Sequence, residues 1–215
     1  MKSSIIGRAC KTGKIEIELV QLRDFAKDSH HACDDYPYGG GAGMVLKPEP
    51  LAAALTSLKS RCHRTVYLSP SGRQLDQCVV NEYVCCESIL LIAGRYEGVD
   101  QRIIDRYVDE ELSIGDYVLG GGEVAAMVVI ESVARLVPGV INRESLRDES
   151  FADNLLEYPH YTRPEEFEGQ HVPKILLSGN HKMISAWRHE QRLKKTQRYR
   201  PELLERDHTE ENDES

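Results

Sequence analysis

The sequence predicts an α/β protein with a largely parallel sheet, followed by a small, mainly helical second domain. The first observation is that short, continuously apolar runs alternate with segments of helical periodicity, which is typical of a sheet covered by helices. The second is a change beyond Asn142 to polar, aperiodic sequence and then a basic helix. We therefore place the two domains at residues 1–141 and 151–215, joined by a linker at residues 142–150.

The elements of the first domain follow from local patterns along the chain. Alternation of charged and apolar residues at 14–22 predicts a strand, and Leu51–Leu58 has helical spacing. Further strands are expected at residues 64–68, 88–94 and 110–114, and further helices at 74–84, 97–108 and 123–137. Pro138-Gly139 ends the last of these helices.

Three of the predicted strands end in loops of small or polar residues. These loops are Ser69–Gly72, Gly94–Gly98 and Ile114–Gly122. Ligands of open α/β sheets bind outside the carboxyl ends of the strands. If the strands are neighbours, the three loops line one crevice, and this convergence predicts a binding site.

Gly120–Gly122 belongs to no common phosphate-binding motif. Neither it nor Gly39–Gly43 has the Gly-Lys-Ser/Thr ending of a P-loop or the GxGxxG pattern of dinucleotide folds. Glycine lets main-chain groups approach a flat ring, so such loops could hold an adenosine. A tight turn with close helix packing explains the triplet equally well. Glu97 could likewise meet a cationic ligand or compensate a helix N-terminus.

Composition indicates a globular protein without a membrane span. The 215 residues are 40% hydrophobic and 29% charged, and no apolar run reaches the ~18 residues that a spanning helix needs. The N-terminal segment is too polar for a secretory signal. The six cysteines form no CxxC pair, and we therefore expect them to be reduced thiols. We therefore expect a cytoplasmic protein.

The net charge of −8 is unevenly distributed. Residues 205–215 carry six acids against one base, whereas residues 181–200 carry seven bases against one acid. The basic segment also contains Trp187 and Tyr199. It could meet a polyanion or simply form a solvated helix face.

Seven motifs together resemble one enzyme family. In order along residues 7–204 they are DDYPYGGGAGM, YLSPSGRQLDQ, GRYEGVDQRI, DEELSIGDYVLGGGE, ESVARLVPGV, YPHYTRP and LLSGNH followed by WR. Their order and spacing resemble those of the bacterial tRNA (guanine-N1)-methyltransferases. The resemblance implies transfer of the methyl group of S-adenosylmethionine to N1 of the guanosine immediately 3′ of the anticodon.

The resemblance also implies a fold and a cofactor site. In this family the strand-end loops form a deep trefoil knot around the cofactor, so residues 1–141 would be the knotted, cofactor-binding domain. The residues that match the cofactor-binding positions are Tyr67, Leu68, Ser69, Pro70, Gly72, Gly94, Tyr96, Glu97, Ile114, Gly115, Asp116, Tyr117, Val118, Leu119, Gly121 and Gly122. Family members are homodimers that share the active site between subunits. Magnesium is a further cofactor consistent with the family, although no side chains are assigned to a metal.

The chemistry of the transfer needs a base and a cation. Guanine N1 carries a proton that a carboxylate must remove, and a cation should stabilise charge developing on O6. Arg135 matches the family arginine assigned to this charge, whereas its spacing from Glu131 would also suit a helix ion pair. The family usually has Asp directly before Ser-Phe, and here Glu149 stands there with Asp148 before it. We assign the base to this pair, favouring Glu149; the alternative is that both are solubility charges of the linker.

RNA binding is expected in the second domain, by stacking and phosphate contact. The residues assigned to it are His160, Tyr161, Arg163, Arg188, Lys194, Lys195 and Arg198. Asp34, Asp35 and Tyr38–Gly41 are expected to shape the guanine side of the site, and the target base is expected to flip into it.

Two departures from the family pattern support a rival interpretation. The family usually opens with a strand and an LFPE-like turn before the segment equivalent to Ile5–Arg8, and this element is not in the sequence. The base position also differs from the family pattern. A catalytically impaired RNA-binding protein of the same fold is therefore the alternative. A related knotted methyltransferase acting on another RNA is disfavoured by the PHYTRP and LLSGNH segments.

Overall fold

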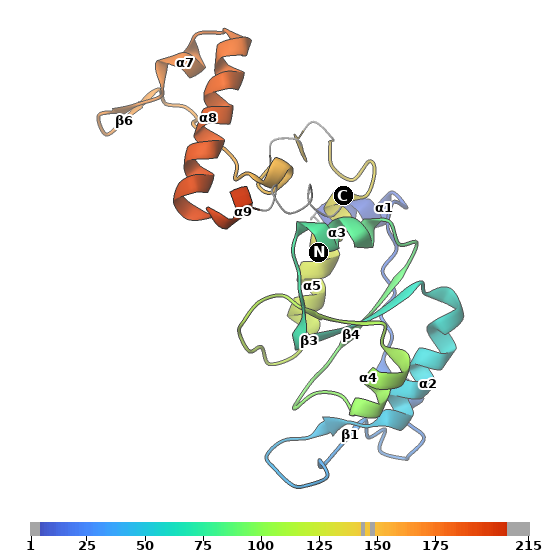
Figure 1. Ribbon diagram of the computed structural model, residues 1–215. Helices are drawn as coiled ribbons and strands as arrows, with labels where there is room; N and C mark the ends of the chain where they lie inside the picture. Colours follow the sequence, from blue (N-terminus) through green and yellow to red (C-terminus); the bar gives the residue numbers. More distant parts are fainter. Residues whose placement is uncertain (1–4, 143–144, 147–148, 206–215) are drawn as a thin grey trace, which may run out of the picture. The chain divides into compact units, whose positions relative to one another are not determined.

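The computed structural model describes residues 5–142, 145–146 and 149–205. It divides into two compact units, Met1–Ile141 and Asn142–Ser215, which we call unit 1 and unit 2 (Figure 1). The elements of unit 1 are α1 (Ile5–Lys11), η1 (Leu22–Phe25), β1 (Asp34–Asp35), β2 (Val45–Leu46), α2 (Pro48–Leu58), η2 (Lys59–Arg61), β3 (Arg64–Gln74), α3 (Gln77–Val84), β4 (Ile89–Ala93), α4 (Gln101–Tyr107), β5 (Glu110–Ser113) and α5 (Glu123–Leu136).

A three-stranded parallel sheet forms the centre of unit 1 (Figure 1). β3 is the middle strand, with β4 on one side and β5 on the other. It pairs with β4 up to Leu68↔Ala93 and with β5 up to Gln74↔Ser113, both in parallel. The three strands predicted from their apolar runs are therefore neighbours, and the predicted parallel α/β class is confirmed.

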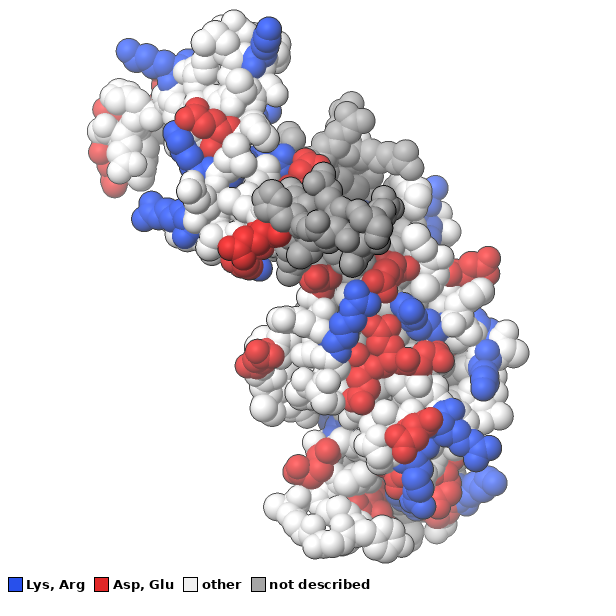
Figure 2. Space-filling view, in the orientation of Figure 1, with Lys and Arg blue, Asp and Glu red and all other residues white. Residues whose placement is uncertain are grey.

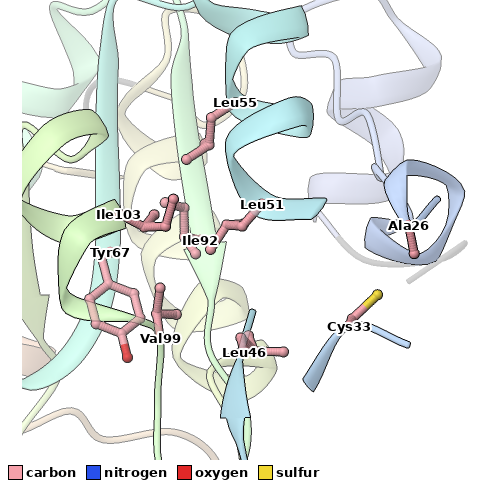
Figure 3. Close-up of a cluster of buried hydrophobic side chains, with 9 residues drawn as sticks. All are labelled: Ala26, Cys33, Leu46, Leu51, Leu55, Tyr67, Ile92, Val99 and Ile103. Atoms are coloured by element: carbon pink, nitrogen blue, oxygen red, sulfur yellow. The ribbon is translucent and has the colours of Figure 1, made fainter. Parts of the chain in front are cut away.

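Alternate side chains of β3 pack on opposite faces of the sheet. Val66 and Leu68 join the cluster that holds Val79 of α3 and Val129 of α5. Tyr67 points to the other face, into a cluster that also holds side chains of α2 and α4 (Figure 3). Burying each large apolar side chain contributes about 1.5–3 kcal/mol. A charged residue at the fully buried Val66 would therefore disrupt the sheet.

Two sequence predictions within unit 1 are wrong. Residues 14–22 form no strand: the chain runs without regular structure to Gln21 and then enters η1. Leu19 is 92% exposed, and none of the described strands pairs with this segment, so its alternation is not stabilised by a ladder. The expected loop at residues 69–72 lies inside β3 instead, where the pairing with β5 shifts register between Leu68 and Arg73.

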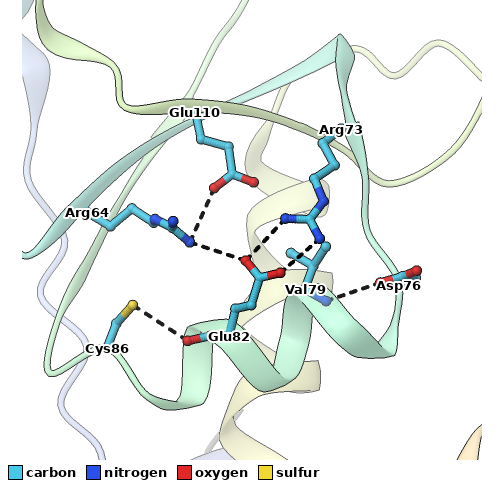
Figure 4. Close-up of polar contacts among 7 residues, drawn as sticks. All are labelled: Arg64, Arg73, Asp76, Val79, Glu82, Cys86 and Glu110. Atoms are coloured by element: carbon cyan, nitrogen blue, oxygen red, sulfur yellow. Dashed lines mark hydrogen bonds and ion pairs between the residues drawn. The ribbon is translucent and has the colours of Figure 1, made fainter. Parts of the chain in front are cut away.

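A polar network braces this irregular part of β3 against α3 (Figure 4). Arg73, which follows the register shift, donates to both oxygens of Glu82 at 2.8 and 3.1 Å. Arg64, at the start of the strand, lies 3.6 Å from Glu82 and 3.4 Å from Glu110. The hydrogen bond from Arg73 holds the pKa of Glu82 below its usual range. Both ends of β3 are thereby tied to one helix.

In the described part of unit 2, the named elements are several short ones and one long helix. They are η3 (Ala152–Asn154), β6 (Glu166–Phe167), β7 (Gln170–His171), α7 (Lys174–Leu177), α8 (His181–Tyr199) and α9 (Glu202–Glu205). The helix α8 covers the basic segment and begins after Asn180, whose side chain accepts a hydrogen bond from Met183 N at 3.2 Å. Figure 2 shows Lys and Arg side chains at several points on the visible face of this unit.

Candidate functional site

The second and third strand-end loops meet at the carboxyl-terminal edge of the sheet. Gly122 N–H donates to the carbonyl oxygen of Gly94 at 2.8 Å, and Arg95 forms an isolated antiparallel bridge with Gly121. The second loop also bonds to the segment before β2, where Glu97 N–H donates to the carbonyl oxygen of Met44 at 2.9 Å. Main-chain bonds thus join segments that are far apart in the sequence.

Close backbone approach explains one of the three consecutive glycines, Gly122. A Cβ atom on Gly122 would lie 2.8 Å from Ala93 Cα and 3.0 Å from Gly94 N, so only glycine fits there. At Gly121 an added Cβ would collide with the carboxylate of Glu123. Gly120 has nothing within 4 Å of the same position. The close packing of the tight-turn interpretation is therefore present at Gly122, which directly precedes α5, and the ligand role of the triplet stays a prediction.

The side chain of Tyr67 packs beneath the second loop, against Gly94 and Gly98. Its ring is buried, and a Cβ on Gly94 or Gly98 would lie 3.0 or 3.2 Å from its ring and hydroxyl atoms. Burial, and then the charge of Glu111, raise the pKa of Tyr67 above its usual value. The tyrosine is therefore a neutral packing group at neutral pH.

The first loop is held by the strand beside it. Ser71 Oγ donates to Glu111 Oε2 at 2.9 Å and lies 2.7 Å from Ser69 Oγ. A Cβ on Gly72 would overlap the main chain between Glu111 and Leu112. The bulge of β3 is thus fixed against β5, which sets where Ser69 and Pro70 lie.

The third loop presents apolar side chains to solvent. Tyr117, Val118 and Leu119 are 55%, 90% and 40% exposed, and Tyr96 of the second loop is 57% exposed. The Tyr117 hydroxyl donates to the carbonyl oxygen of Ile114 at 3.2 Å, which folds the loop on itself. Gly115 has a φ of 144°, and the tyrosine ring occupies the space where its Cβ would stand. Exposed aromatic and apolar groups beside glycine-rich main chain suit a flat, partly apolar ligand.

One ion pair closes the edge between the second loop and α5. Arg95 Nε lies 2.5 Å from Glu123 Oε1. A main-chain hydrogen bond at its own amide, and then Arg95, lower the pKa of Glu123. The first turn of α5 thereby carries a negative charge, which is favourable at a helix N-terminus.

The proposed catalytic residues lie in different units. Arg135 is half-buried in the last turn of α5, in unit 1, whereas Glu149 is half-buried in unit 2 just before η3. Asp148 lies outside the described residues. Asp34 and Asp35 form β1 and pair with β2, while Tyr38 is fully exposed in the glycine-rich turn that follows.

The segment after Glu149 has a backbone conformation that L-residues rarely adopt. Phe151, Asp153 and Asn154 have φ angles of 74°, 53° and 54°, and each such residue costs on the order of 1–3 kcal/mol. Two side chains of α8 hold this segment. Arg192 Nη2 donates to the carbonyl oxygen of Ala152 at 2.6 Å, and Leu156 N–H donates to Thr196 Oγ1 at 2.8 Å.

Sequence reasoning missed Arg192 and Thr196, although both are buried in the helix that it singled out. A basic helix was read as a surface that meets solvent or RNA, and nothing in its periodicity marks one arginine as internal. The available signal is Thr196, a β-branched residue that lies four positions after Arg192 in a stretch rich in charged residues.

The structure brings together three of the seven residues assigned to RNA binding. His160, Tyr161 and Arg188 line one hollow of about 210 Å³ in unit 2. The other four are dispersed: Arg163 is exposed before β6, Lys194 pairs with Glu190 at 2.6 Å, Lys195 lies half-buried on α8, and Arg198 stacks on Tyr199 at 5.1 Å.

A larger hollow of about 450 Å³ lies at the amino-terminal edge of the sheet, between Arg61–His63 and Glu87–Ser88. It is at the wrong end of the strands for a ligand of the glycine loops. Within residues 5–142, 145–146 and 149–205, no three His, Cys, Asp or Glu side chains form a group that could hold a metal ion. In the same part of the chain, no helix combines the length and apolarity of a membrane span.

Comparison with known proteins finds one family model and many relatives of the same name. A family model described as "tRNA (Guanine-1)-methyltransferase TrmD" matches residues 1–206. A tRNA (guanine-N(1)-)-methyltransferase of Treponema denticola is 52% identical over 205 residues, 95% of this chain and 84% of the relative. The protein of that name from Borreliella burgdorferi is 53% identical over 204 residues, 94% and 85% of the two chains. That of Chloroflexus aurantiacus is 52% identical over 209 residues, 96% and 83%.

These matches define the chain as an enzyme of the methyltransferase class, built on a parallel α/β sheet. Within that class, the chain belongs to the tRNA (guanine-1)-methyltransferase TrmD family. The resemblance drawn from the seven sequence motifs is confirmed.

Proposed function

We propose that this chain methylates N1 of the tRNA guanine immediately 3′ of the anticodon, with S-adenosylmethionine as methyl donor. The observation that carries the proposal is the junction of two strand-end loops through the Gly122–Gly94 hydrogen bond of 2.8 Å. This junction supports a ligand site at the sheet edge in a chain whose relatives are named for this reaction.

The described residues fit an adenosine-containing cofactor. Gly94, Gly98 and Gly122 keep the edge clear of side chains, and exposed Tyr117 and Leu119 offer apolar surface to a purine. When bound, the sulfonium of the cofactor supplies an activated methyl group. The task of the loops is to hold it in line with the acceptor nitrogen.

In this proposal, Glu149 removes the proton and Arg135 stabilises the developing charge. Glu149, with Asp148 beside it in sequence, takes the proton from N1, which frees the lone pair for attack. Arg135 stabilises the negative charge that develops on O6. Its position in the last turn of α5 adds the favourable field of a helix C-terminus for a cation. Among the described residues, no group of three His, Cys, Asp or Glu side chains is placed to hold Mg²⁺.

The proposal includes a homodimer, a knot and a cytoplasmic setting. Val124, Met127 and Val128 form an exposed apolar stripe on α5, next to the open third loop. A second copy covering this stripe would stabilise the dimer by about 25 cal/mol for each Å² of apolar surface that is removed from water. It would also enclose the cofactor site. The close approach of Gly122 to Ala93 and Gly94 supports the tight chain crossing that a trefoil knot needs. Unit 2 would hold the tRNA.

The proposal is tested by methyl transfer to a guanosine-containing anticodon stem-loop, with Arg135→Ala compared with wild type. We expect kcat to fall about 10²–10³-fold, the usual effect of removing one donor to a developing oxyanion. Arg106→Ala, an exposed arginine of α4, is the matched control and should retain the wild-type rate. Calorimetry with S-adenosylhomocysteine checks that Arg135→Ala still binds cofactor.

Two outcomes would contradict the proposal. An unchanged rate for Arg135→Ala would remove the charge stabiliser. RNA binding by the wild type without methyl transfer would favour the impaired RNA-binding alternative. Glu149→Gln and Asp148→Asn, assayed in parallel, assign the base: the true base should lose about 10²–10⁴-fold in rate.

A further inference from the structure

Three side-chain oxygens form a hydrogen-bonded row at the first strand-end loop. Ser71 Oγ donates to Glu111 Oε2 at 2.9 Å, and Ser69 Oγ lies 2.7 Å from Ser71 Oγ. The main-chain N–H of Ser71 also donates to Ser69 Oγ, at 3.2 Å. We call Ser69, Ser71 and Glu111 the hydroxyl relay.

The carboxylate at one end fixes the direction of the protons in the hydroxyl relay. A carboxylate only accepts hydrogen bonds, whereas a hydroxyl has one proton and two lone pairs. Because Ser71 gives its single proton to Glu111, the bond between the two serines must be donated by Ser69. Ser69 Oγ therefore has no proton left for a ligand and can only accept from one.

One lone pair of Ser69 Oγ remains for a ligand. The other accepts from Ser71 N–H, and no further donor reaches this oxygen from the described part of the chain. Ser69 is half-buried, so part of it is accessible. The hydroxyl relay thus leaves a hydrogen-bond acceptor of known polarity at the loop.

Ser69 stands at the sheet edge where the cofactor is proposed to bind. The pairing of β3 with β4 ends at Leu68↔Ala93, so the next residues along the two strands are Ser69 and Gly94. The acceptor is therefore next to the glycine main chain of the second loop.

Holding the loop in place does not account for the hydroxyl relay. A Cβ on Gly72 would overlap the main chain of β5, and Arg73 is bonded to Glu82 of α3, so the bulge of β3 is already fixed. Ser71 is exposed, and its hydroxyl could bond to water at little cost to stability. The direction of the protons, unlike the position of the loop, matters only to a ligand.

We propose that Ser71 and Glu111 are positioning residues, which hold Ser69 Oγ as the acceptor for a hydroxyl or amino group of the cofactor. The inference rests on the proposed function, because that function supplies the cofactor. An acceptor that is fixed before binding avoids the entropic cost of ordering it in the complex. It also disfavours a ligand that presents an acceptor of its own at this place.

Ser71→Thr and Ser71→Val are a matched pair for the test, because their side chains have nearly the same shape and differ in the hydroxyl. Isothermal titration calorimetry of the full chain with S-adenosylhomocysteine measures the effect. We expect Ser71→Thr to bind within about twofold of wild type and Ser71→Val to raise the Kd about tenfold, the scale of one hydrogen bond. Equal urea midpoints for the two variants separate this effect on the ligand from an effect on the fold.

Two further variants show whether Ser71 acts through Ser69 and under the control of Glu111. Ser69→Ala should also raise the Kd about tenfold. The double variant Ser69→Ala/Ser71→Val should bind as Ser69→Ala does, since residues of one hydrogen-bond network are not additive. Glu111→Leu should raise the Kd about fivefold, because Ser71 can then donate to Ser69 and turn the Ser69 proton towards the ligand.

The inference is overturned if Ser71→Thr and Ser71→Val bind equally well, if the losses in the double variant add, or if Glu111→Leu binds as wild type does. Ser71→Ala takes the place of Ser71→Val if that variant fails to fold. Absence of binding by the wild type would refute the proposed cofactor, and with it this inference. Wild-type binding with equal affinities in the matched pair would overturn this inference alone.

Discussion

The candidate site at the sheet edge of unit 1 depends on main-chain contacts, whereas the candidate site on α8 of unit 2 depends on side-chain contacts. At the sheet edge the contacts that join the loops are main chain to main chain, as between Gly122 and Gly94, and glycine stands where the chains approach most closely. On α8 the important contacts are made by long side chains, such as Arg188 on Tyr158 and Arg192 on Ala152.

This difference predicts opposite responses to substitution. Where main-chain atoms nearly touch, an added methyl group has no space, and the damage comes from adding atoms. Where side chains fill and tether a surface, the damage comes from removing atoms or leaving polar groups unpaired. Each of the following substitutions tests that contrast.

The largest effect is expected from Gly122→Ala. The new Cβ would stand 2.8 Å from Ala93 Cα and 3.0 Å from Gly94 N, and neither main-chain atom can move away alone. Shifting the third loop should raise the Kd of S-adenosylhomocysteine about 100-fold, equivalent to about 2.7 kcal/mol. Isothermal titration calorimetry measures this directly.

Gly120→Ala is the matched control for that substitution. It adds the same methyl group two residues away, where nothing lies within 4 Å. Its affinity for S-adenosylhomocysteine should stay within about twofold of wild type, because surface substitutions usually change free energies by less than about 0.5 kcal/mol. Equal loss in both variants would mean that glycine flexibility, rather than close approach, is what the loop requires.

A smaller effect is expected from Arg192→Ala in unit 2. The variant loses the charge-assisted hydrogen bond to Ala152 O, one of the two side-chain hydrogen bonds that hold the segment of the left-handed residues Phe151, Asp153 and Asn154. We expect a loss of about 2 kcal/mol in the free energy of unfolding, measured by urea denaturation. Arg198→Ala, an exposed arginine near the end of the same helix, should lose less than about 0.5 kcal/mol.

The same substitution bears on catalysis through Glu149, which lies two residues before Phe151. If η3 positions the carboxylate, Arg192→Ala should lower kcat while the Kd for S-adenosylhomocysteine stays unchanged. An unfolding free energy equal to that of Arg198→Ala would show that the buried arginine does not support the segment.

Sequence patterns were sufficient to predict the strands of the sheet, but they did not predict the side-chain hydrogen bonds by which α8 holds the segment after Glu149. β4 and β5 were predictable because continuous apolar runs with helical segments between them have few alternatives, and parallel order places their loops together. The strand prediction for residues 14–22 is wrong because alternation indicates a strand only where a neighbouring strand supplies a hydrogen-bond ladder. The buried Arg192 could not be predicted, since its partner is a carbonyl oxygen 40 residues away, and main-chain acceptors carry no sequence signal.

Tyr67 is a buried side chain at the sheet edge, where the other loop contacts are made by the main chain. Its substitution by Phe should have the smallest effect of the changes considered. Burial raises its pKa above the unfolded value of about 10. The folded state therefore favours the neutral phenol, and this contribution is present below about pH 10 and lost as the pH rises through the folded pKa. Tyr67→Phe should change the unfolding free energy at pH 7 by less than about 1 kcal/mol and flatten its decline above pH 10. Tyr36→Phe, a largely exposed tyrosine, should leave that decline as in wild type. If the unfolding free energy of Tyr67→Phe shows the wild-type pH dependence, ionisation of the Tyr67 phenol does not destabilise the fold. The sheet-edge site then needs only the ring of Tyr67 and not its hydroxyl.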